Sequence, residues 1–277
     1  MAKPKDSTTE AKRKRWERLR RKNADKPGNI TDRTLWCRHE IKYIINESIA
    51  AAIVEFIKPY MQPDRYCMSQ PRGRYPIVSL YLDSRNLQLY RESLQGLKNR
   101  FKLRIRSYTD EPDYPRFFEI KRRAGSIIIK SRTQVLHEQL MPLLSGSAWP
   151  LCTNDGELRQ FLLYMNSIGA RPTVRIRYMR QAFEGTLDKR VRITFDRDLC
   201  YNITRKADVS LNGRAWQLMH KNRVILEIKF TGRYPVWIDR MVKHFGLRQQ
   251  SVSKYASSIK QASLLRFCAP KISENGL

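Results

Sequence analysis

The sequence predicts an α+β fold, a closed antiparallel β-barrel of about eight strands with flanking helices. Three observations lead to this fold class. Predicted strands outnumber predicted helices, the helices are few and short, and six of the strands carry charged side chains at every second position among apolar residues. Because side chains along a strand point alternately to its two faces, each of these six strands has one apolar and one charged face.

One alternating strand on its own is typical of a solvated outer surface, but six in one chain favour a shared charged surface. If these faces turn inward around a closed sheet, many cations share a confined space, which is tolerable only if that space is wet and filled by a polyanion. The pattern therefore predicts a tunnel for phosphates. The six segments are 38–45 (RHEIKYII), 101–108 (FKLRIRSY), 117–123 (FFEIKRR), 127–135 (IIIKSRTQV), 191–196 (VRITFD) and 225–230 (ILEIKF).

The composition favours a soluble, cytoplasmic protein that attracts anions. The chain has 277 residues, 41% hydrophobic content and a net charge of +28, so its field draws in phosphate-rich partners. Five scattered cysteines without a Cys-x-x-Cys pair indicate reduced thiols rather than a disulfide framework or a zinc site. No segment is long and apolar enough to span a bilayer, and we expect no signal peptide. A peripheral position at a membrane stays open.

We expect three parts in the chain, a basic N-terminal arm at 1–34, one domain at 35–265 and a tail at 266–277. The arm has twelve Lys or Arg against five Asp or Glu, a net charge of +7, and few apolar residues. It is either a solvated, mobile arm, which we favour, or a basic helix that lies on a nucleic acid or an acidic membrane surface.

The first half of the domain is predicted to contain two strand and helix pairs followed by a three-stranded antiparallel meander. Asn46 stands at the N-cap of an amphipathic helix, and Ser84 stands at the N-cap of the next one. Turn residues at 111–113 and 124–125 separate the meander strands. The expected ranges are 35–45 (strand), 46–61 (helix), 75–84 (strand), 85–98 (helix), and 100–108, 115–123 and 126–135 (strands).

The second half is predicted to contain three more strands between helices. A helix over 157–168 ends at Gly169, and strands follow at 171–183, 189–199 and 222–230. Pro235 suits the first position of a helix that ends at Gly246, and a last helix begins near Ser253.

Seven short motifs, taken together with their order and spacing, resemble the polyphosphate polymerase domain of the vacuolar transporter chaperone (VTC) family over about 35–262. This family is part of the triphosphate tunnel metalloenzyme, or CYTH-like, superfamily. The resemblance implies a closed barrel that binds ATP and Mn²⁺ (or Mg²⁺) and transfers the γ-phosphate onto polyphosphate or pyrophosphate. The motifs are Glu40-Ile41-Lys42-Tyr43, Arg104-Ile105-Arg106, Glu119-Ile120-Lys121, Tyr178-Met179-Arg180-Gln181-Ala182, Arg192-Ile193-Thr194-Phe195-Asp196, Glu227-Ile228-Lys229-Phe230 and Ser253-Lys254-Tyr255.

The resemblance also implies roles for individual residues. Glu227 matches the family's metal-binding carboxylate, and Arg104, Arg106, Lys121 and Ser253 are expected at the nucleotide. Guanidinium groups can grip two phosphate oxygens at once, whereas lysines act as compact point charges. The expected phosphate-contacting, catalytic cations are Lys42, Arg104, Arg106, Lys121, Lys130, Arg180, Arg192, Lys229 and Lys254.

Plain alternatives stand beside these assignments. Glu227, Glu119 and Glu40 could each pair with a lysine on the same strand instead of binding metal. Arg175 and Arg177 point to the face opposite Arg180, so one of these two sets must lie outside the tunnel. Ser253 and Lys254 lie at a helix, where a charge is often simply solvated.

Three classes of function are open, and one departure from related tunnels bears on the choice. Simple triphosphatases of the superfamily begin with Glu-x-Glu-x-Lys, but Arg38 occupies the place of the first Glu here. This change favours a polymerase over a tripolyphosphatase or nucleoside triphosphatase in the same tunnel. The third class is a non-enzymatic polyanion binder, with nucleic acid held non-specifically through the arm, but no nucleic-acid reading motif is present.

Export of the product would depend on a further component. The eukaryotic members carry a regulatory domain before the catalytic part and membrane helices after it, and we expect neither in this chain. Synthesis coupled to export would therefore require a separate membrane subunit.

Overall fold

The computed structural model describes residues 38–125, 127–145, 154–186, 190–213, 215–219 and 222–265. The expected arm at 1–34, the tail at 266–277 and the first residues of the expected strand at 35–45 lie outside these ranges. The strands are β1 (Arg38–Ile45), β2 (Met61–Pro63), β3 (Tyr75–Asp83), β4 (Asn99–Ser107), β5 (Arg116–Ala124), β6 (Ile127–Val135), β7 (Arg171–Gly185), β8 (Arg192–Ile203), β9 (Gln217–Leu218) and β10 (Val224–Thr231).

The described helices are short and follow or separate the strands. They are α2 (Glu47–Ile57), α3 (Arg65–Met68), α4 (Gln88–Leu94), the 3₁₀ helix η2 (His137–Gln139), α5 (Leu140–Ser145), α6 (Gly156–Ser167), α7 (Val236–His244) and α8 (Lys254–Leu264). The fold is therefore α+β, as the sequence predicts. The short elements β2, α3, β9, η2 and α5 were not predicted, because segments of two to six residues carry too little periodicity.

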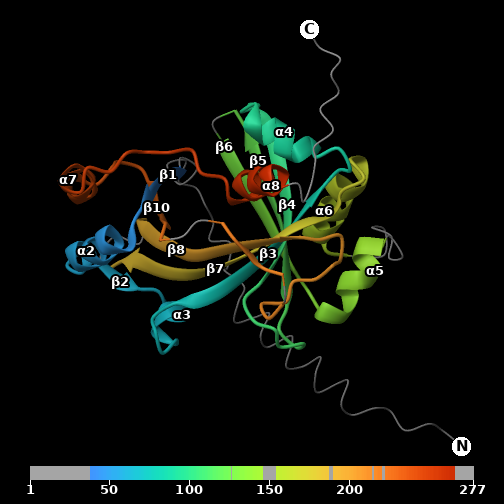
Figure 1. Ribbon diagram of the computed structural model, residues 1–277, viewed down its shortest axis with the longest axis horizontal. Coiled ribbons are helices and arrows are strands. Elements are labelled where there is room, and N and C mark those ends of the chain that lie inside the picture. The colour runs from blue at the N-terminus through green and yellow to red at the C-terminus, as the bar shows by residue number, and fades with distance from the viewer. Residues whose placement is uncertain are drawn as a thin grey trace, which may run out of the picture. The chain divides into compact units, whose positions relative to one another are not determined.

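All described strands belong to one antiparallel sheet of ten strands. The main path runs β1-β10-β8-β7-β3-β4-β5-β6, while β2 pairs with β7 and β9 pairs with β8. In Figure 1, β7 and β8 cross the view and β5 and β6 stand nearly upright, so the sheet turns strongly along this path. Its end strands β1 and β6 are not paired with each other, so hydrogen bonds do not close the sheet into the predicted barrel.

The free edge of β1 is occupied by the segment that leads into α8. Gln250 N–H donates to the Lys42 carbonyl at 2.9 Å, and the Lys42 ammonium donates to the Val252 carbonyl at 3.2 Å. This segment takes a hydrogen-bonding position that a closing strand would need, which explains why strand pairing stops at β1. Side chains reach further, because Lys121 on β5 lies 3.1 Å from Glu40 on β1.

Three apolar clusters hold the sheet and helices together. One lies between the β1, β10 and β8 part of the sheet and helices α2 and α7, and it includes Ile53, Ile228 and Ile238. A second lies between β3, β4 and β5 and helices α5 and α6, and it includes Leu103 and Phe161. In both clusters the apolar face of the alternating strands is covered by helices, as burial of that face requires.

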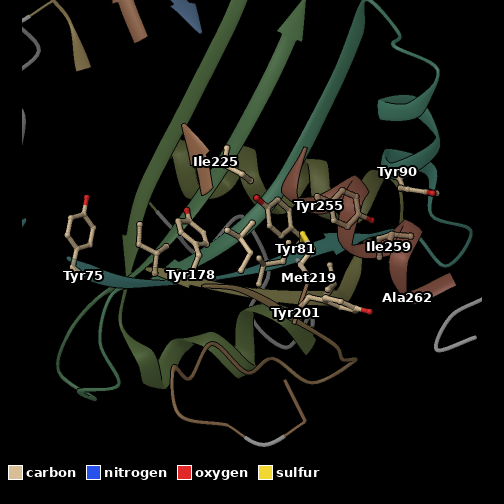
Figure 2. Packing of buried hydrophobic residues seen from close by; sticks show 14 of the residues in the cluster. Tyr75, Tyr81, Tyr90, Tyr178, Tyr201, Met219, Ile225, Tyr255, Ile259 and Ala262 are labelled. Carbon is tan, nitrogen blue, oxygen red and sulfur yellow. The ribbon is translucent and has the colours of Figure 1, made fainter. Parts of the chain in front are cut away.

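The third cluster seats α8 on the opposite face of the sheet, against β3 and β7. Figure 2 shows Tyr255 of α8 beside Tyr81, and their stacked rings have centroids 5.1 Å apart. The Tyr255 hydroxyl also donates to the buried Asp83 carboxylate, which accepts from the backbone N–H groups of Leu89 and Tyr90 at 2.9 Å each. The same carboxylate therefore fixes the start of α4 and the position of α8.

Four predicted helix ends are confirmed, whereas the helix predicted over 46–61 already ends at Ile57 and is followed by β2 from Met61. Asn46 accepts from the Ile49 N–H at 2.8 Å as the N-cap of α2, and Ser253 caps α8 by accepting from Ala256 N–H at 3.2 Å. Gly169 and Gly246 have φ of 57° and 58° and follow the ends of α6 and α7, where this left-handed conformation favours glycine.

Two predicted helix starts are wrong. The helix expected at 85–98 is only Gln88–Leu94, with Leu87 as N-cap, because Asp83 binds the first-turn N–H groups and leaves Ser84 only the Gln88 N–H. Pro235 is the N-cap of α7 rather than its first helical residue, since its ψ of 135° is extended.

No helix within the described ranges is long and apolar enough to cross a membrane.

Candidate functional site

One face of the sheet carries charged side chains, and we call it the charged face. Directly paired residues of neighbouring strands share a face, and the pairs run Lys42 with Glu227, Lys229 with Arg192, and Arg180 with Asp196 at one end of the path. At the other end, Lys102 pairs with Lys121 and Lys121 with Lys130, while Arg104 pairs with Glu119 and Glu119 with Arg132. The predicted convergence of alternating cations on one surface is confirmed.

Four cations surround one carboxylate at the β4–β5–β6 end. The Glu119 side chain is only 1% exposed, and its distances are 2.5 Å to Arg104 Nε, 3.9 Å to Arg106 Nη1, 3.0 Å to Lys130 Nζ and 3.5 Å to Arg132 Nε. We call these five residues the Glu119 cluster. With one negative and four positive groups, it carries a surplus of positive charge.

Burial and the neighbouring charges shift the pKa values of the ionisable groups in this cluster. Burial raises the pKa of the Glu119 carboxyl, but the cations around it, Arg104 first, outweigh burial and hold the pKa well below its ordinary value. Burial lowers the pKa of Lys130 to about 8, and the attraction of Glu119 offsets this only in part because the neighbouring arginines oppose it. The cluster therefore holds more positive charge than its own carboxylate can stabilise.

Aromatic side chains fix the cations of this cluster in place. The Arg132 guanidinium lies 3.8 Å from the centre of the Phe117 ring. Arg104 donates to the Tyr81 hydroxyl and Arg106 to the Tyr178 hydroxyl, both at 3.4 Å. Stacking and these weak bonds orient the guanidinium groups without cancelling their charge.

Two carboxylates and three lysines meet where β1 pairs with β10. Lys42 Nζ lies 2.8 Å from Glu40 and 3.9 Å from Glu227, Lys229 contacts Glu227, and Lys121 reaches Glu40 from β5. We call this set the Glu40–Glu227 cluster. Unlike the Glu119 cluster, it holds no arginine and is nearly balanced in charge.

Both carboxyl groups of this cluster stay ionised. Burial and the charge of Glu227 raise the pKa of Glu40, but Lys42 and Lys121 outweigh them and lower it to about 2. Burial also raises the pKa of Glu227, and Lys229 and Lys42 hold it well below its ordinary value. Two adjacent carboxylates are therefore available as oxygen ligands at neutral pH.

A third group lies under the N-terminus of α8. Asp196 is fully buried and binds Arg180 through both oxygens, at 2.7 and 2.8 Å, and Lys254 at 2.6 Å. Ser253, the N-cap of the helix, accepts from Lys102 at 2.8 Å. The expected residues Ser253 and Lys254 therefore face the sheet and are not simply solvated.

Arg192, the register partner of Lys229, binds a carboxylate outside the two clusters. It donates to Asp64 at 2.7 Å, and Asp64 also caps α3 by accepting from the Cys67 N–H at 2.9 Å.

The neighbouring thiol of Cys67 is a packing group. Burial raises its pKa to about 11, so it stays protonated at neutral pH.

The structure settles which arginines of β7 face the charged surface. Arg180 does, whereas Arg175 and Arg177 stack on Trp216 on the other face, with guanidinium carbons 4.6 and 4.7 Å from the ring centre. Arg175 also pairs with Asp208. The outward set is thus covered by the loop after β8.

Sequence reasoning missed several residues of the site. Asp196 follows the same alternation as Arg192 and could have been found by extending that pattern. Tyr81 could also have been found, since it falls on the charged face of its strand, and Lys102 belongs to the predicted alternating strand 101–108 but was given no role in the site. Asp64 stands in no alternating strand and gave no signal.

The residues that the structure describes do not form a complete protein ligand set for a metal ion. Within the described ranges, no group of three or more His, Cys, Asp or Glu side chains could hold a metal ion. Glu40 and Glu227 offer two hard oxygen donors, and a metal bound there would take its remaining ligands from substrate phosphates and water.

Comparison with known proteins finds one family model that covers most of the chain. A family model described as VTC domain matches residues 37–263. No curated protein matches significantly.

Solved structures give only distant likenesses. A Bacillus halodurans protein provisionally described as an adenylate cyclase has 11% identity and a TM-score of 0.46, covering 77% of this chain and 92% of its own. The PH1819 protein of Pyrococcus horikoshii has 10% identity and a TM-score of 0.42, covering 81% and 99%. The Mediator head module of Schizosaccharomyces pombe follows at 8% and 0.37, covering 83% and 94%. With identities this low and TM-scores below 0.5, none of them bears on function.

Proposed function

This chain belongs to the VTC domain family, and from that premise we propose that it is a polyphosphate polymerase that uses ATP as phosphoryl donor. In this reaction a terminal oxygen of the growing chain attacks the γ-phosphorus of ATP. The bond from the γ-phosphorus to the β,γ-bridging oxygen breaks, ADP leaves, and the chain is longer by one phosphate.

The observation that carries this proposal is the Glu119 cluster. Phosphoryl transfer asks little covalent chemistry of a protein and depends on positioning and on neutralising charge on the transferred group. Arg104, Arg106, Lys130 and Arg132 surround one buried carboxylate, which holds them in place and leaves a positive surplus for phosphate oxygens. A purely structural ion pair would need only one of these cations.

The other expected residues take roles that suit their positions. Arg104, Arg106, Lys121 and Ser253 would hold the nucleotide, since Ser253 and Lys102 already join the α8 N-terminus to β4. The remaining cations would bind phosphates along the charged face, as compact charges for the lysines and as forks for the arginines. They are Lys42, Lys130, Arg180, Arg192, Lys229 and Lys254.

The carboxylates of the Glu40–Glu227 cluster fit a divalent metal, either Mn²⁺ or Mg²⁺. Glu227 would be the principal ligand and Glu40 the second, because one or two carboxylates plus substrate phosphates are the usual setting for Mg²⁺. When bound, such an ion neutralises phosphate oxygens and orients the leaving group. Lys42 contacts both carboxylates and Lys229 contacts Glu227, and these lysines keep the two carboxyl groups ionised.

We also propose that the charged face encloses the phosphate chain as a tunnel. The contacts that support this are the Lys121–Glu40 ion pair between β5 and β1 and the Gln250–Lys42 hydrogen bond at the edge of β1. Enclosure by side chains would let the cations act with little screening by water.

Incubation of the pure protein with ATP and Mn²⁺, followed by gel separation of the products, tests the proposal. Chains longer than the nucleotide's triphosphate support a polymerase, and free phosphate alone would show a hydrolase in the same site. No turnover together with tight polyanion binding would show a binding protein. Arg132→Gln should slow turnover, whereas Arg205→Gln removes the same charge from the exposed loop after β8 and serves as the control.

A further inference from the structure

The cationic rows of the charged face extend beyond every residue assigned above. Arg100 on β4 pairs with Arg123 on β5, one row outside the Lys102–Lys121 pair. Both arginines lie on the charged face, because they are two residues along each strand from these lysines. At about 3.3 Å per residue, Arg100 stands roughly 13 Å along β4 from Arg104.

This outer row lacks the carboxylates that characterise the inner ones. Among the residues that the structure describes, no Asp or Glu forms an ion pair with Arg100 or Arg123. Their guanidinium groups donate instead to backbone carbonyls, Arg100 to that of Leu97 and Arg123 to that of Gly125 at 2.9 Å. Neutral acceptors of this kind hold the side chains in position without cancelling their charge.

Positive charges are concentrated around Arg100 and Arg123. Burial lowers the pKa of Arg100, and the neighbouring charge of Arg123 lowers it further. Burial also lowers the pKa of Lys102 to about 8, with Lys121, Lys42 and Arg100 adding to the effect against the opposing influence of Tyr81. The charge of Arg100 therefore acts on the same space as the inner row of lysines.

We propose that Arg100 and Arg123 form an additional anion subsite that binds phosphate units of a linear polyphosphate chain outside the site of phosphoryl transfer. The proposal rests on the proposed function for the position of the inner phosphates. A ligand that contacts both Arg104 and Arg100 must span roughly 13 Å, so the subsite selects for chain length.

A phosphate group could also reach this row from a lipid. Ile127 and Ile128, at the start of β6, are 48% and 41% exposed, and Ile128 pairs with Arg123. The shared chemistry is a phosphate oxygen held between two guanidinium groups, and the experiment below separates the two sources.

The test compares binding of tripolyphosphate and of long-chain polyphosphate to the full chain, without nucleotide. In the double variant Arg100→Gln/Arg123→Gln, affinity for the long chain should fall by about tenfold or more, since two charge-assisted contacts are lost. Affinity for tripolyphosphate should change by less than about threefold, because it is held by the inner rows. The control Arg205→Gln/Lys206→Gln removes the same charge from an exposed loop and should affect both ligands equally and weakly.

Three results would overturn the subsite. One is an unchanged affinity for long chains, and another is an equal loss for both phosphate ligands. The third is a loss of binding to phosphatidylcholine–phosphatidylserine vesicles with polyphosphate binding intact, which would assign the row to lipid headgroups. Because no turnover is measured, a protein that binds long chains through this row and makes none from ATP would disprove the polymerase and leave the subsite standing.

Discussion

The Glu119 cluster and the Glu40–Glu227 cluster lie on the same face of one sheet and differ in composition and balance. The first has four cations, three of them arginines, around one carboxylate, and the second has three lysines around two carboxylates. Three neighbouring strands supply the first, while the second joins β1 and β10 at one end of the strand path to β5, next to the other end.

The difference separates two tasks that a phosphate-handling site has to perform. A surplus of oriented guanidinium groups is suited to hold phosphate oxygens. A nearly balanced set with two ionised carboxylates offers oxygen ligands to a metal ion. In the first cluster, by contrast, the single carboxylate is engaged with its own four cations. On this comparison, substitutions in the two clusters should have effects of different kinds.

The largest expected effect is on stability, in Glu119→Gln. Four cations would lose their shared counter-charge, so the unfolding free energy should fall by about 3–5 kcal/mol. Urea unfolding measures this, and tripolyphosphate should restore more stability to the variant than it adds to the native protein. Glu40→Gln is the matched control, and an equal loss in both variants would erase the contrast between the clusters.

The same carboxylate gives this stability a defined pH dependence. The folded-state pKa of Glu119 is held below its unfolded value of about 4.3. Its contribution is therefore fully present above that unfolded value and disappears as the pH falls through the folded pKa.

Glu227→Gln should act on turnover rather than on folding. The side chains are nearly isosteric, and Glu40 remains to pair with Lys42, so the fold should persist. If Glu227 is the metal ligand, turnover should fall by more than about a hundredfold and its dependence on Mn²⁺ should shift to higher concentration. Unchanged turnover and metal dependence would make Glu227 a structural ion-pair partner.

Single cations should matter less. Lys229→Ala or Arg192→Ala removes one charge-assisted contact, worth about 1.5–3 kcal/mol, and should lower kcat roughly tenfold to a hundredfold if the contact tightens in the transition state.

Deletion of residues 1–30 should leave turnover at saturating ATP nearly intact and weaken capture of long polyanions in a salt-dependent way. The reverse pattern would make the N-terminal arm the functional element.

The smallest expected effect is a pH dependence of anion binding at the Glu119 cluster. The pKa of Lys130 is about 8 without ligand, so the lysine is protonated below that pH and its attraction for tripolyphosphate is lost above it. Affinity should fall a few-fold from pH 7 to pH 9, and binding at pH 8 should take up protons, which calorimetry in two buffers detects. Tyr81 and Tyr108, whose pKa values are also about 8, add negative charge over the same range.

A variant separates these contributions. Lys130→Gln should lose only the Lys130 part of the pH dependence, and the part due to the tyrosines and to Lys102, whose pKa is also about 8, should persist. A pH profile that is identical in the variant and the native protein would show that Lys130 does not contact the anion.

Strand alternation predicted the charged face well because the two-residue period is a local property of the backbone. It placed Lys42, Arg104 and Lys229 on one surface without knowledge of their partners. The Asn46 and Ser253 caps were equally local, since each side chain binds an N–H group three residues on.

The rest of the fold and of the site depends on contacts between residues far apart in the sequence, which its periodicity does not predict. Nothing in the alternation of β1 indicates that residues 250–252 cover its edge. The sequence therefore predicted a barrel closed by strand pairing, which the structure does not show. The tie from Tyr255 to Asp83 and the pairing of Arg192 with Asp64 join residues 172 and 128 positions apart. For this reason the alternation predicted the cations together with Glu40, Glu119 and Glu227, but not Asp64 and Asp196, which position Arg192 and Arg180.

The pairing of β1 with β10 has a consequence for how the protein is made. β1 is the first described strand, and among the described strands it pairs with β10 alone, which ends at Thr231. At translation rates of about 5–20 residues per second, β1 leaves the ribosome on the order of ten seconds or more before its partner. Throughout that interval Glu40 and Lys42 lie on an unpaired strand, and contacts of such long sequence separation form slowly. The yield of folded protein should therefore depend on the last quarter of the chain, and a nascent chain that stalls before Val224 exposes an aggregation-prone strand.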